Sequence, residues 1–459
     1  MTIGKQAVVI GAGIGGLAAA QALIGSFERI VLLERDHASG AVEPRAGVPQ
    51  GRHAHALLPG GAKALDALFD GFSTALRDAG ARYSDLGLKM QFEFSAQDSV
   101  PEGALGIPLL KCTRPLIESV LLRFLNQRKE IAILDGRRVT GIVATPDGQS
   151  VAAVRCETRD GMHETHDADL VVDASGRGKP TLDFLQATGR SAPEETAFRI
   201  DFSYTTAIIE FADGERPEFD VLRTMPAPPH NPRQGLLLAR EDNCYFASVG
   251  SRGADVPPGD WPGFIEFAAG LQTRSLHDLF KRARLHGKLV QYAFPENRRR
   301  HFERCENWPR GLIPFADAIC RFNPIYGQGM SAAAVEAERL RDVLASRRDG
   351  QHAGHPLDGL FEAFMQKTLP ALDNIWMLAV MPDFAFPETQ GARPDKFEES
   401  LKFNGMLQRA ACIDVDIRKL LFEVMALLKP STELRTEAVV EKVKRLCAEF
   451  DAAKTSLEA

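Results

Sequence analysis

Residues 7–23 read AVVIGAGIGGLAAAQAL, an apolar β-branched run followed by a glycine-rich turn and a row of strong helix formers. Such a short apolar run is typical of a buried parallel strand. Residues 29–33 form a second apolar run, and Glu34 follows it directly. A strand, a glycine turn, a helix and a second strand ending in an acid together predict a Rossmann-like unit that binds a dinucleotide.

The glycine turn suits the phosphate groups of such a ligand. Gly11 permits the tight turn, Gly13 lets the backbone approach a pyrophosphate, and Gly16 lets the helix pack closely against the strand. Glu34 is expected to accept hydrogen bonds from the ribose hydroxyls. The contacts predicted in this unit are Gly11, Ala12, Gly13, Ile14, Gly15, Gly16, Glu34 and Arg35. This unit alone does not distinguish FAD from NAD.

Later stretches of the chain bear on that choice. Residues 170–176 read LVVDASG, an apolar run that ends in small residues, where the chain can pass close to a cofactor. Residues 311–317 read GLIPFAD and place an acid at the end of a third apolar run. They lead into NPIYGQGMS at 323–331, which opens a helix predicted to reach about Ala345.

Residues 113–118 read TRPLIE and place Arg114 at the start of a further helix. With these segments the chain resembles the FAD-dependent aromatic hydroxylases and epoxidases, the group A flavoprotein monooxygenases. The resemblance implies that FAD is the cofactor and that Asp317 binds its ribityl or pyrophosphate region. Ala316 stands where that family usually has a glycine. The further cofactor contacts that the resemblance implies are Arg114, Val139, Pro324, Gly327, Gly329 and Met330.

The resemblance also implies a reaction. NAD(P)H reduces the flavin, and a flavin C4a-hydroperoxide then transfers one oxygen atom from O2 to an apolar unsaturated or aromatic small molecule. Residues 45–61, RAGVPQGRHAHALLPGG, are most similar to bacterial hydroxylases and epoxidases of natural-product, or secondary, metabolism. The alternatives are a reductase or dehydrogenase of the same superfamily, or a halogenase, without oxygen insertion. The sequence lacks the W-x-W-x-I-P segment of flavin-dependent halogenases.

Arg45 and His53 belong to this segment and are the catalytic candidates. The segment follows the second strand closely, so both side chains are expected near the flavin. They can steer NAD(P)H, gate movement of the flavin or hydrogen-bond its ring. In the competing interpretation, His53 is a packing residue with satisfied hydrogen bonds.

The implied fold class is α/β, with a Rossmann-like, three-layer FAD-binding domain of the glutathione-reductase type. An inserted β-sheet substrate domain and a C-terminal helical region complete it. The expected boundaries are 1–75, 105–185 and 295–345 for the FAD-binding domain, 76–104 and 186–294 for the substrate domain, and 346–459 for the helical region. The turn dipeptides Asp147-Gly148 and Asp160-Gly161 predict a β-meander inside the FAD-binding domain.

Alternating apolar residues predict strands over 198–211 and 235–249, and a helix is expected over 261–287. The candidate pocket walls on these strands are Phe202, Tyr204, Tyr245 and Phe246. Helical spacing of apolar residues predicts helices over 361–380 and 417–428. The expected helix breaks are Pro370, Pro382 and Pro387.

The composition is that of a soluble globular protein, with 44% hydrophobic and 25% charged residues among 459. The net charge of −6 argues against nucleic acid as a partner, because phosphate binding needs a basic face. No apolar run reaches the ~18 to 20 residues that span a bilayer. The N-terminus carries no signal-peptide pattern, so a cytoplasmic location is expected.

The seven cysteines are scattered without a CxxC pair, and the histidines lack metal-ligand spacing, so neither disulfides nor a metal are expected. Residues 376–381, WMLAVM, belong to a helical cap over the pocket in one interpretation. In the other they rest weakly on a membrane surface. The oligomeric state stays open, although the amphipathic residues 437–450 can pair with another subunit.

Overall fold

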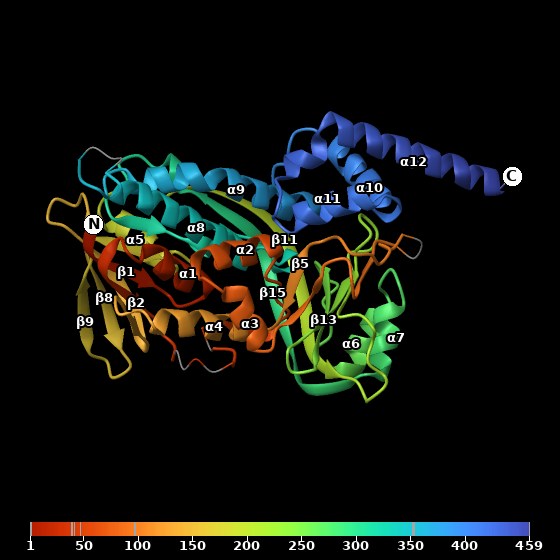
Figure 1. Ribbon diagram of the computed structural model, residues 1–459, viewed down its shortest axis with the longest axis horizontal. Helices are drawn as coiled ribbons and strands as arrows, with labels where there is room; N and C mark the ends of the chain where they lie inside the picture. Colours follow the sequence, from red (N-terminus) through yellow and green to blue (C-terminus); the bar gives the residue numbers. More distant parts are fainter. Residues whose placement is uncertain are drawn as a thin grey trace.

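The computed structural model describes residues 2–37, 40, 42–45, 47–95, 98–350 and 354–458. Figure 1 shows an elongated molecule in which a parallel sheet with its helices lies beside a second, larger sheet. The last helix, α12 (Glu437–Glu458), projects away from the rest of the chain. Ala46, inside the segment 45–61, lies outside the described residues.

A five-stranded parallel sheet is built from three separate stretches of the chain. Its order is β16 (Leu312–Pro314), β10 (Leu170–Asp173), β1 (Gly4–Ile10), β2 (Phe27–Leu33) and β6 (Ile131–Leu134). Every pairing is parallel, so the carboxyl ends of the strands share one edge, where open α/β sheets bind their ligands. The predicted Rossmann-like fold is confirmed.

The two faces of this sheet enter two different cores, because successive strand residues point to opposite sides. Val9 and Leu32 pack with the helices. Val8 and Val31 pack against a three-stranded antiparallel meander, which confirms the prediction made from the two turn dipeptides. The helices of this layer include α1 (Ile14–Leu23), α4 (Arg114–Asn126) and α8 (Gly329–Arg348), and the meander is β7 (Arg137–Ala144), β8 (Val151–Thr158) and β9 (His163–Asp167). Meander, sheet and helices form the expected three layers.

The larger sheet is mainly antiparallel. Its order is β17 (Cys320–Arg321), β15 (Arg284–His301), β11 (Glu194–Glu210), β14 (Tyr245–Arg252), β13 (Gln234–Ala239), β12 (Val221–Thr224) and β4 (Met90–Glu93). The outer face, which carries Ala207 and Tyr245, packs against α6 (Trp261–Ala268) and α7 (Ser275–Arg282). The inner face carries Tyr204, and the strand register places Arg223 on the same face. Tyr204 and Gly11 line one cavity, so the inner face looks toward the parallel sheet.

The helical stretch expected over 261–287 is found in two pieces and ends earlier than predicted. This stretch forms α6 and α7 with a break between them, and β15 already begins at Arg284. The backbone of β15 pairs with β11 from Arg284 to His301, and these ladder bonds take precedence over the helical pattern of the residues around Gly287.

The expected breaks at Pro370 and Pro382 are wrong, because α9 (Leu360–Asp383) continues through both. A proline removes a backbone hydrogen bond, but the buried face of α9 keeps the helix in the core. Trp376 and Val380 are buried on this face, whereas Met377 is exposed. Two further helices, α10 (Phe397–Ile413) and α11 (Val415–Met425), precede α12. None of the helices in the described ranges is long and apolar enough to cross a membrane.

Candidate functional site

A cavity of about 650 Å³ lies between the carboxyl edge of the parallel sheet and the inner face of the larger sheet. Every predicted cofactor contact lines it except Ala12 and Gly16. Residues that are far apart in the sequence therefore meet here, among them Glu34, Val139, Pro324 and Gly327. The two catalytic candidates are not among the lining residues.

The glycine turn leaves room only for backbone. Gly11 has φ +96°, and a Cβ there would lie 2.8 Å from the carbonyl oxygen of Ala174. A Cβ on Gly16 would lie 1.8 Å from the carbonyl oxygen of Gly11, so the helix packs directly on the turn. Among the residues that the structure describes, no side chain caps the N-terminus of α1, and Gly13 and Ile14 line the cavity. The first N–H groups of α1 are thus free to bind an anionic group, as a pyrophosphate requires.

Glu34 is already held in place at the end of β2. Its carboxylate accepts a hydrogen bond from the Ala12 N–H (2.7 Å) and forms an ion pair with Arg45 (3.0 Å). Arg45 also donates to the Ala12 carbonyl oxygen (2.8 Å) and to Glu118 (2.9 Å). The structure thus places Arg45 behind the glycine turn, where it ties β2, the turn and α4 together.

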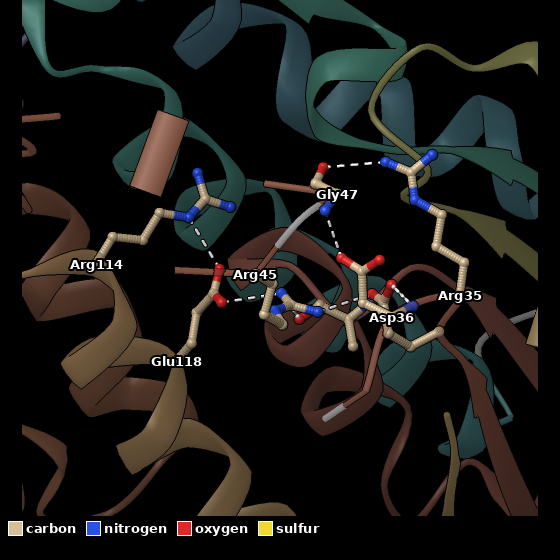
Figure 2. A network of polar contacts seen from close by, with 8 residues as sticks. Arg35, Asp36, Arg45, Gly47, Arg114 and Glu118 are labelled. Carbon is tan, nitrogen blue, oxygen red and sulfur yellow. Dashed lines mark hydrogen bonds and ion pairs between the residues drawn. The ribbon is translucent and has the colours of Figure 1, made fainter. Parts of the chain in front are cut away.

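Glu118 connects the two arginines of this network (Figure 2), and the sequence analysis missed it. One carboxylate oxygen binds Arg45, and the other accepts from Arg114 Nε at 2.9 Å. Arg114 lines the cavity and reaches to within 3.3 Å of where a Cβ of Gly13 would be. The i,i+4 spacing of Arg114 and Glu118 on a predicted helix is the signal that could have identified this pair.

Gly47 is fixed on the outer side of the same network (Figure 2). Its N–H donates to the Asp36 carboxylate at 2.6 Å, and its carbonyl oxygen accepts from Arg35 at 3.0 Å. Arg35 also lines the cavity, so these contacts hold the segment after β2 against its rim.

The loop after β16 provides a second set of cavity residues. Ala316 adopts φ +55°, the left-handed conformation that favours glycine, and its N–H donates to Glu336 at 2.8 Å. The turn at this alanine therefore keeps a conformation suited to glycine. Burial raises the pKa of Asp317, which lines the cavity, while Arg321 and Arg114 act in the opposite direction. Gly329 begins α8, so a second helix N-terminus opens on the cavity, with no side-chain cap in the part of the chain that is described.

His53 is buried behind an aromatic wall. Its Nδ1 lies 2.9 Å from the Thr206 hydroxyl, and its ring centroid lies 4.7 Å from that of Tyr204 and 5.7 Å from that of Tyr292. Burial lowers the pKa of His53 to about 4, so the imidazole is neutral at physiological pH. Tyr204 and Tyr292 line the cavity, together with the neighbouring His55.

The expected pocket walls divide between the two faces of the larger sheet. Tyr204 lines the cavity, whereas Tyr245 packs against α6 and α7 on the opposite face. Phe246 is buried in a small cluster with Val221 and Leu238, and Phe202 lines a neighbouring cavity instead. Adjacent strand residues cannot share a face, which the sequence analysis overlooked for the pair 245–246. Tyr292 and Phe294 were missed, although they lie opposite Tyr204 and Phe202 in the strand register.

Comparisons with known proteins agree with this geometry. The family model for FAD-dependent oxidoreductases matches residues 6–182. Protein Rv3254 of Mycobacterium tuberculosis is 30% identical over 409 residues, which cover 83% of this chain and 80% of that protein.

Solved structures with similar folds are flavoproteins. A flavoprotein/dehydrogenase from Cytophaga hutchinsonii has a TM-score of 0.69 at 14% identity, covering 97% of this chain and all of that one. The flavin-dependent brominase Bmp2 has a TM-score of 0.66 at 16% identity, covering 98% of this chain and 100% of that one. PqsL of Pseudomonas aeruginosa, a probable FAD-dependent monooxygenase, has a TM-score of 0.63 at 14% identity, covering 83% and 96%. At these identities the likeness establishes the fold.

Proposed function

Because the chain belongs to the FAD-dependent oxidoreductases of the group A flavoprotein superfamily, we propose that it is an NAD(P)H-dependent monooxygenase. Its substrate would be an apolar unsaturated or aromatic small molecule, which receives one oxygen atom from O2 by hydroxylation or epoxidation. The observation that carries this proposal is that an aromatic wall of Tyr204, Tyr292 and Phe294 lines the same cavity as the glycine turn and Glu34. A flat apolar substrate fits such a wall.

The lining residues suit the successive parts of FAD. Glu34 and Val139 would hold the adenosine part, and the free N–H groups at Gly13 would hold the pyrophosphate. Asp317 and the loop with Pro324 and Gly327 would hold the ribityl chain and the flavin ring. Bound flavin supplies the redox chemistry, taking electrons from the nicotinamide nucleotide and activating O2.

The chain's own residues would position the reactants and exclude water. The aromatic wall, in which Phe294 is buried and both tyrosines are partly buried, would keep solvent from the flavin ring and so protect a reactive oxygenating species. His53 is neutral and bonded to Thr206, so we propose that it positions Tyr204 and Tyr292 rather than transferring a proton. Arg45 would fix Glu34 and the glycine turn in their binding conformation.

The test begins with the visible spectrum of the purified protein. The proposal is supported if the protein is yellow, loses this colour with NADPH or NADH in the absence of oxygen, and regains it in air. Products formed under ¹⁸O2 from a panel of unsaturated lipophiles then decide the reaction type, because a monooxygenase incorporates one labelled atom. Turnover without label indicates a reductase or dehydrogenase, and brominated product in the presence of bromide indicates a halogenase. Colourless protein that cannot be reconstituted with FAD overturns the proposal.

A further inference from the structure

A second cavity of about 290 Å³ opens beside the first, and four of its side chains are arginines. The residues that line this arginine pocket are Arg177, Arg298, Arg300, Asp317, Ile319 and Arg321. Arg177, Asp317 and Arg321 also line the main cavity, so the two spaces adjoin along these residues. A ligand in the arginine pocket would therefore extend to the flavin site.

Two of the arginines are fixed by the protein itself. Arg300 donates to Glu195 at 2.9 Å and to the carbonyl oxygens of Arg177 (3.0 Å) and Ala318 (2.9 Å). Arg298 pairs with Glu296 and with Glu195. These contacts neutralise both charges and hold the pocket wall in one shape.

The other two guanidinium groups lack such partners. Within the described ranges, neither Arg177 nor Arg321 forms a side-chain hydrogen bond or an ion pair. Arg321 lies over the ring of Phe294, with its guanidinium carbon 5.2 Å from the ring centroid, and Arg177 is exposed. The pocket thus carries positive charge that its one remaining carboxylate, Asp317, does not match.

The strand register strengthens this observation. Arg298 and Arg321 lie directly opposite each other on β15 and β17. Like charges in that position destabilise a sheet, and Glu195 and Glu296 offset the repulsion by binding Arg298 but not Arg321. Gly178 (φ +64°) lets the backbone after Arg177 pack closely, because a Cβ there would lie 3.1 Å from both Ala318 Cβ and Arg300 Nη1. The backbone beside Arg177 is thus packed closely against the segment of Ala318 and against Arg300.

We propose that the arginine pocket binds the phosphate groups of the reducing nicotinamide nucleotide, with Arg177 and Arg321 as the direct ligands. Guanidinium groups bind phosphate oxygens in pairs, and the fixed arginines add a background of positive charge. Contact with the main cavity would let the nicotinamide reach the flavin ring from this side. This inference rests on the proposed function, because it assigns the binding site of its reductant.

The test compares Arg177→Gln and Arg321→Gln with Arg304→Gln, which changes an exposed arginine paired with Glu194 outside the pocket. The holoproteins are reduced by NADPH and by NADH in an anaerobic stopped-flow instrument. Each pocket variant should raise the nucleotide Kd about tenfold, because a charge-assisted hydrogen bond is lost. FAD content and reduction by dithionite, measured for every protein, show whether the flavin site is intact, and the Arg304 variant should match the parent protein throughout.

A readout without turnover completes the test. Inorganic pyrophosphate and NADP⁺ are titrated into the oxidised holoprotein and followed by the flavin fluorescence, and both should bind more weakly to the pocket variants. A loss confined to NADPH assigns the pocket to the 2′-phosphate, and an equal loss for NADH assigns it to the pyrophosphate. Unchanged Kd values overturn the inference, as does loss of FAD, which would show that these arginines hold the flavin cofactor. If nicotinamide nucleotides do not reduce the parent protein, the proposed function fails, while the pyrophosphate titration still decides whether the pocket binds phosphate.

Discussion

The Tyr326 hydroxyl donates a hydrogen bond of 2.8 Å to the carboxylate of Asp383, which joins the loop of Pro324 and Gly327 to the end of α9. The same carboxylate accepts from Asn297 Nδ2 at 2.8 Å and from Asn323 Nδ2 at 3.2 Å, and it pairs with Arg252. Asp383 is fully buried. One carboxylate thus fixes the cavity loop against two strands of the larger sheet and the C-terminal helices.

We expect Asp383→Asn to lower the free energy of unfolding by about 3–5 kcal/mol, because it leaves the buried Arg252 guanidinium without its counter-charge. FAD should also be retained less well, since the loop loses its anchor. Urea unfolding and the ratio of flavin to protein measure these effects. Glu362→Gln, on an exposed part of α9, is the matched control and should change stability by less than about 1 kcal/mol. Equal stability of the two variants would contradict the role assigned to Asp383.

Ala316→Gly should stabilise the protein by about 1 kcal/mol, because the alanine is held at φ +55° and glycine adopts that conformation without a Cβ penalty. Ala333→Gly, within α8, should have the opposite sign, with a loss of about 0.5–1 kcal/mol from helix entropy. Thermal unfolding of both variants provides the measurement. A lower midpoint for Ala316→Gly would mean that the methyl packing of Ala316 outweighs its backbone strain.

Glu336→Gln should flatten the pH dependence of stability. Burial raises the pKa of Glu336 from its ordinary 4.5 to about 8, so between these values the folded state keeps a proton that the unfolded chain releases. The free energy of unfolding should then fall by up to about 1.4 kcal/mol per pH unit in this interval, and the glutamine variant should lack this slope. Urea unfolding at several pH values between 5 and 8 tests this, with Glu338→Gln on the same helix as the control. Parallel curves for all three proteins are the contrary result.

Arg223→Met should raise stability by about 1 kcal/mol, because a desolvated cation without a counter-charge gives way to an apolar side chain of similar length. Burial lowers the pKa of Arg223, an effect that Tyr326 opposes, and within the described ranges its guanidinium has no carboxylate partner, although it lies 5.7 Å from the Phe92 ring centroid. Arg138→Met, at an exposed ion pair with Glu157, should stay within about 0.5 kcal/mol of the parent. Loss of stability in Arg223→Met would show that the folded protein compensates this charge.

His53→Ala should slow reduction of the flavin by about tenfold or more, because Tyr204 and Tyr292 lose the ring that they pack against. FAD content should be unchanged, since His53 does not line the cavity. Since its pKa is about 4, His53 should add no inflection to the reduction rate between pH 6 and 8. His286→Ala, an exposed histidine on β15, is the control. Unchanged reduction kinetics would remove His53 from the candidates.

The sequence predicts those parts of the site that depend on residues close together in the chain. The glycine turn, Glu34 and Asp317 closely follow β1, β2 and β16, and these parallel strands end at one sheet edge. The β-meander followed from turn dipeptides for the same reason.

What the sequence could not predict depends on contacts between distant residues. The Asp383 carboxylate binds side chains that lie 57 to 131 positions away in the sequence, and no spacing rule connects them. The break at Pro370 was wrong because the tertiary packing of α9 outweighs a local penalty. The prediction placed Tyr245 in the pocket on its residue type alone. The two-residue period of a strand puts its side chain on the opposite face of the sheet.

The division of the parallel sheet among three stretches also governs when the protein can acquire its cofactor during synthesis. The glycine turn leaves the ribosome first, whereas Asp317 and Gly329 follow more than 300 residues later. At about 5–20 residues per second the nascent chain holds half of the binding site for roughly 15 to 60 s. The flavin can therefore bind only late in synthesis, when its binding brings the early and the late stretches of the domain together. A chain truncated before α8 would retain the glycine signature and yet remain colourless.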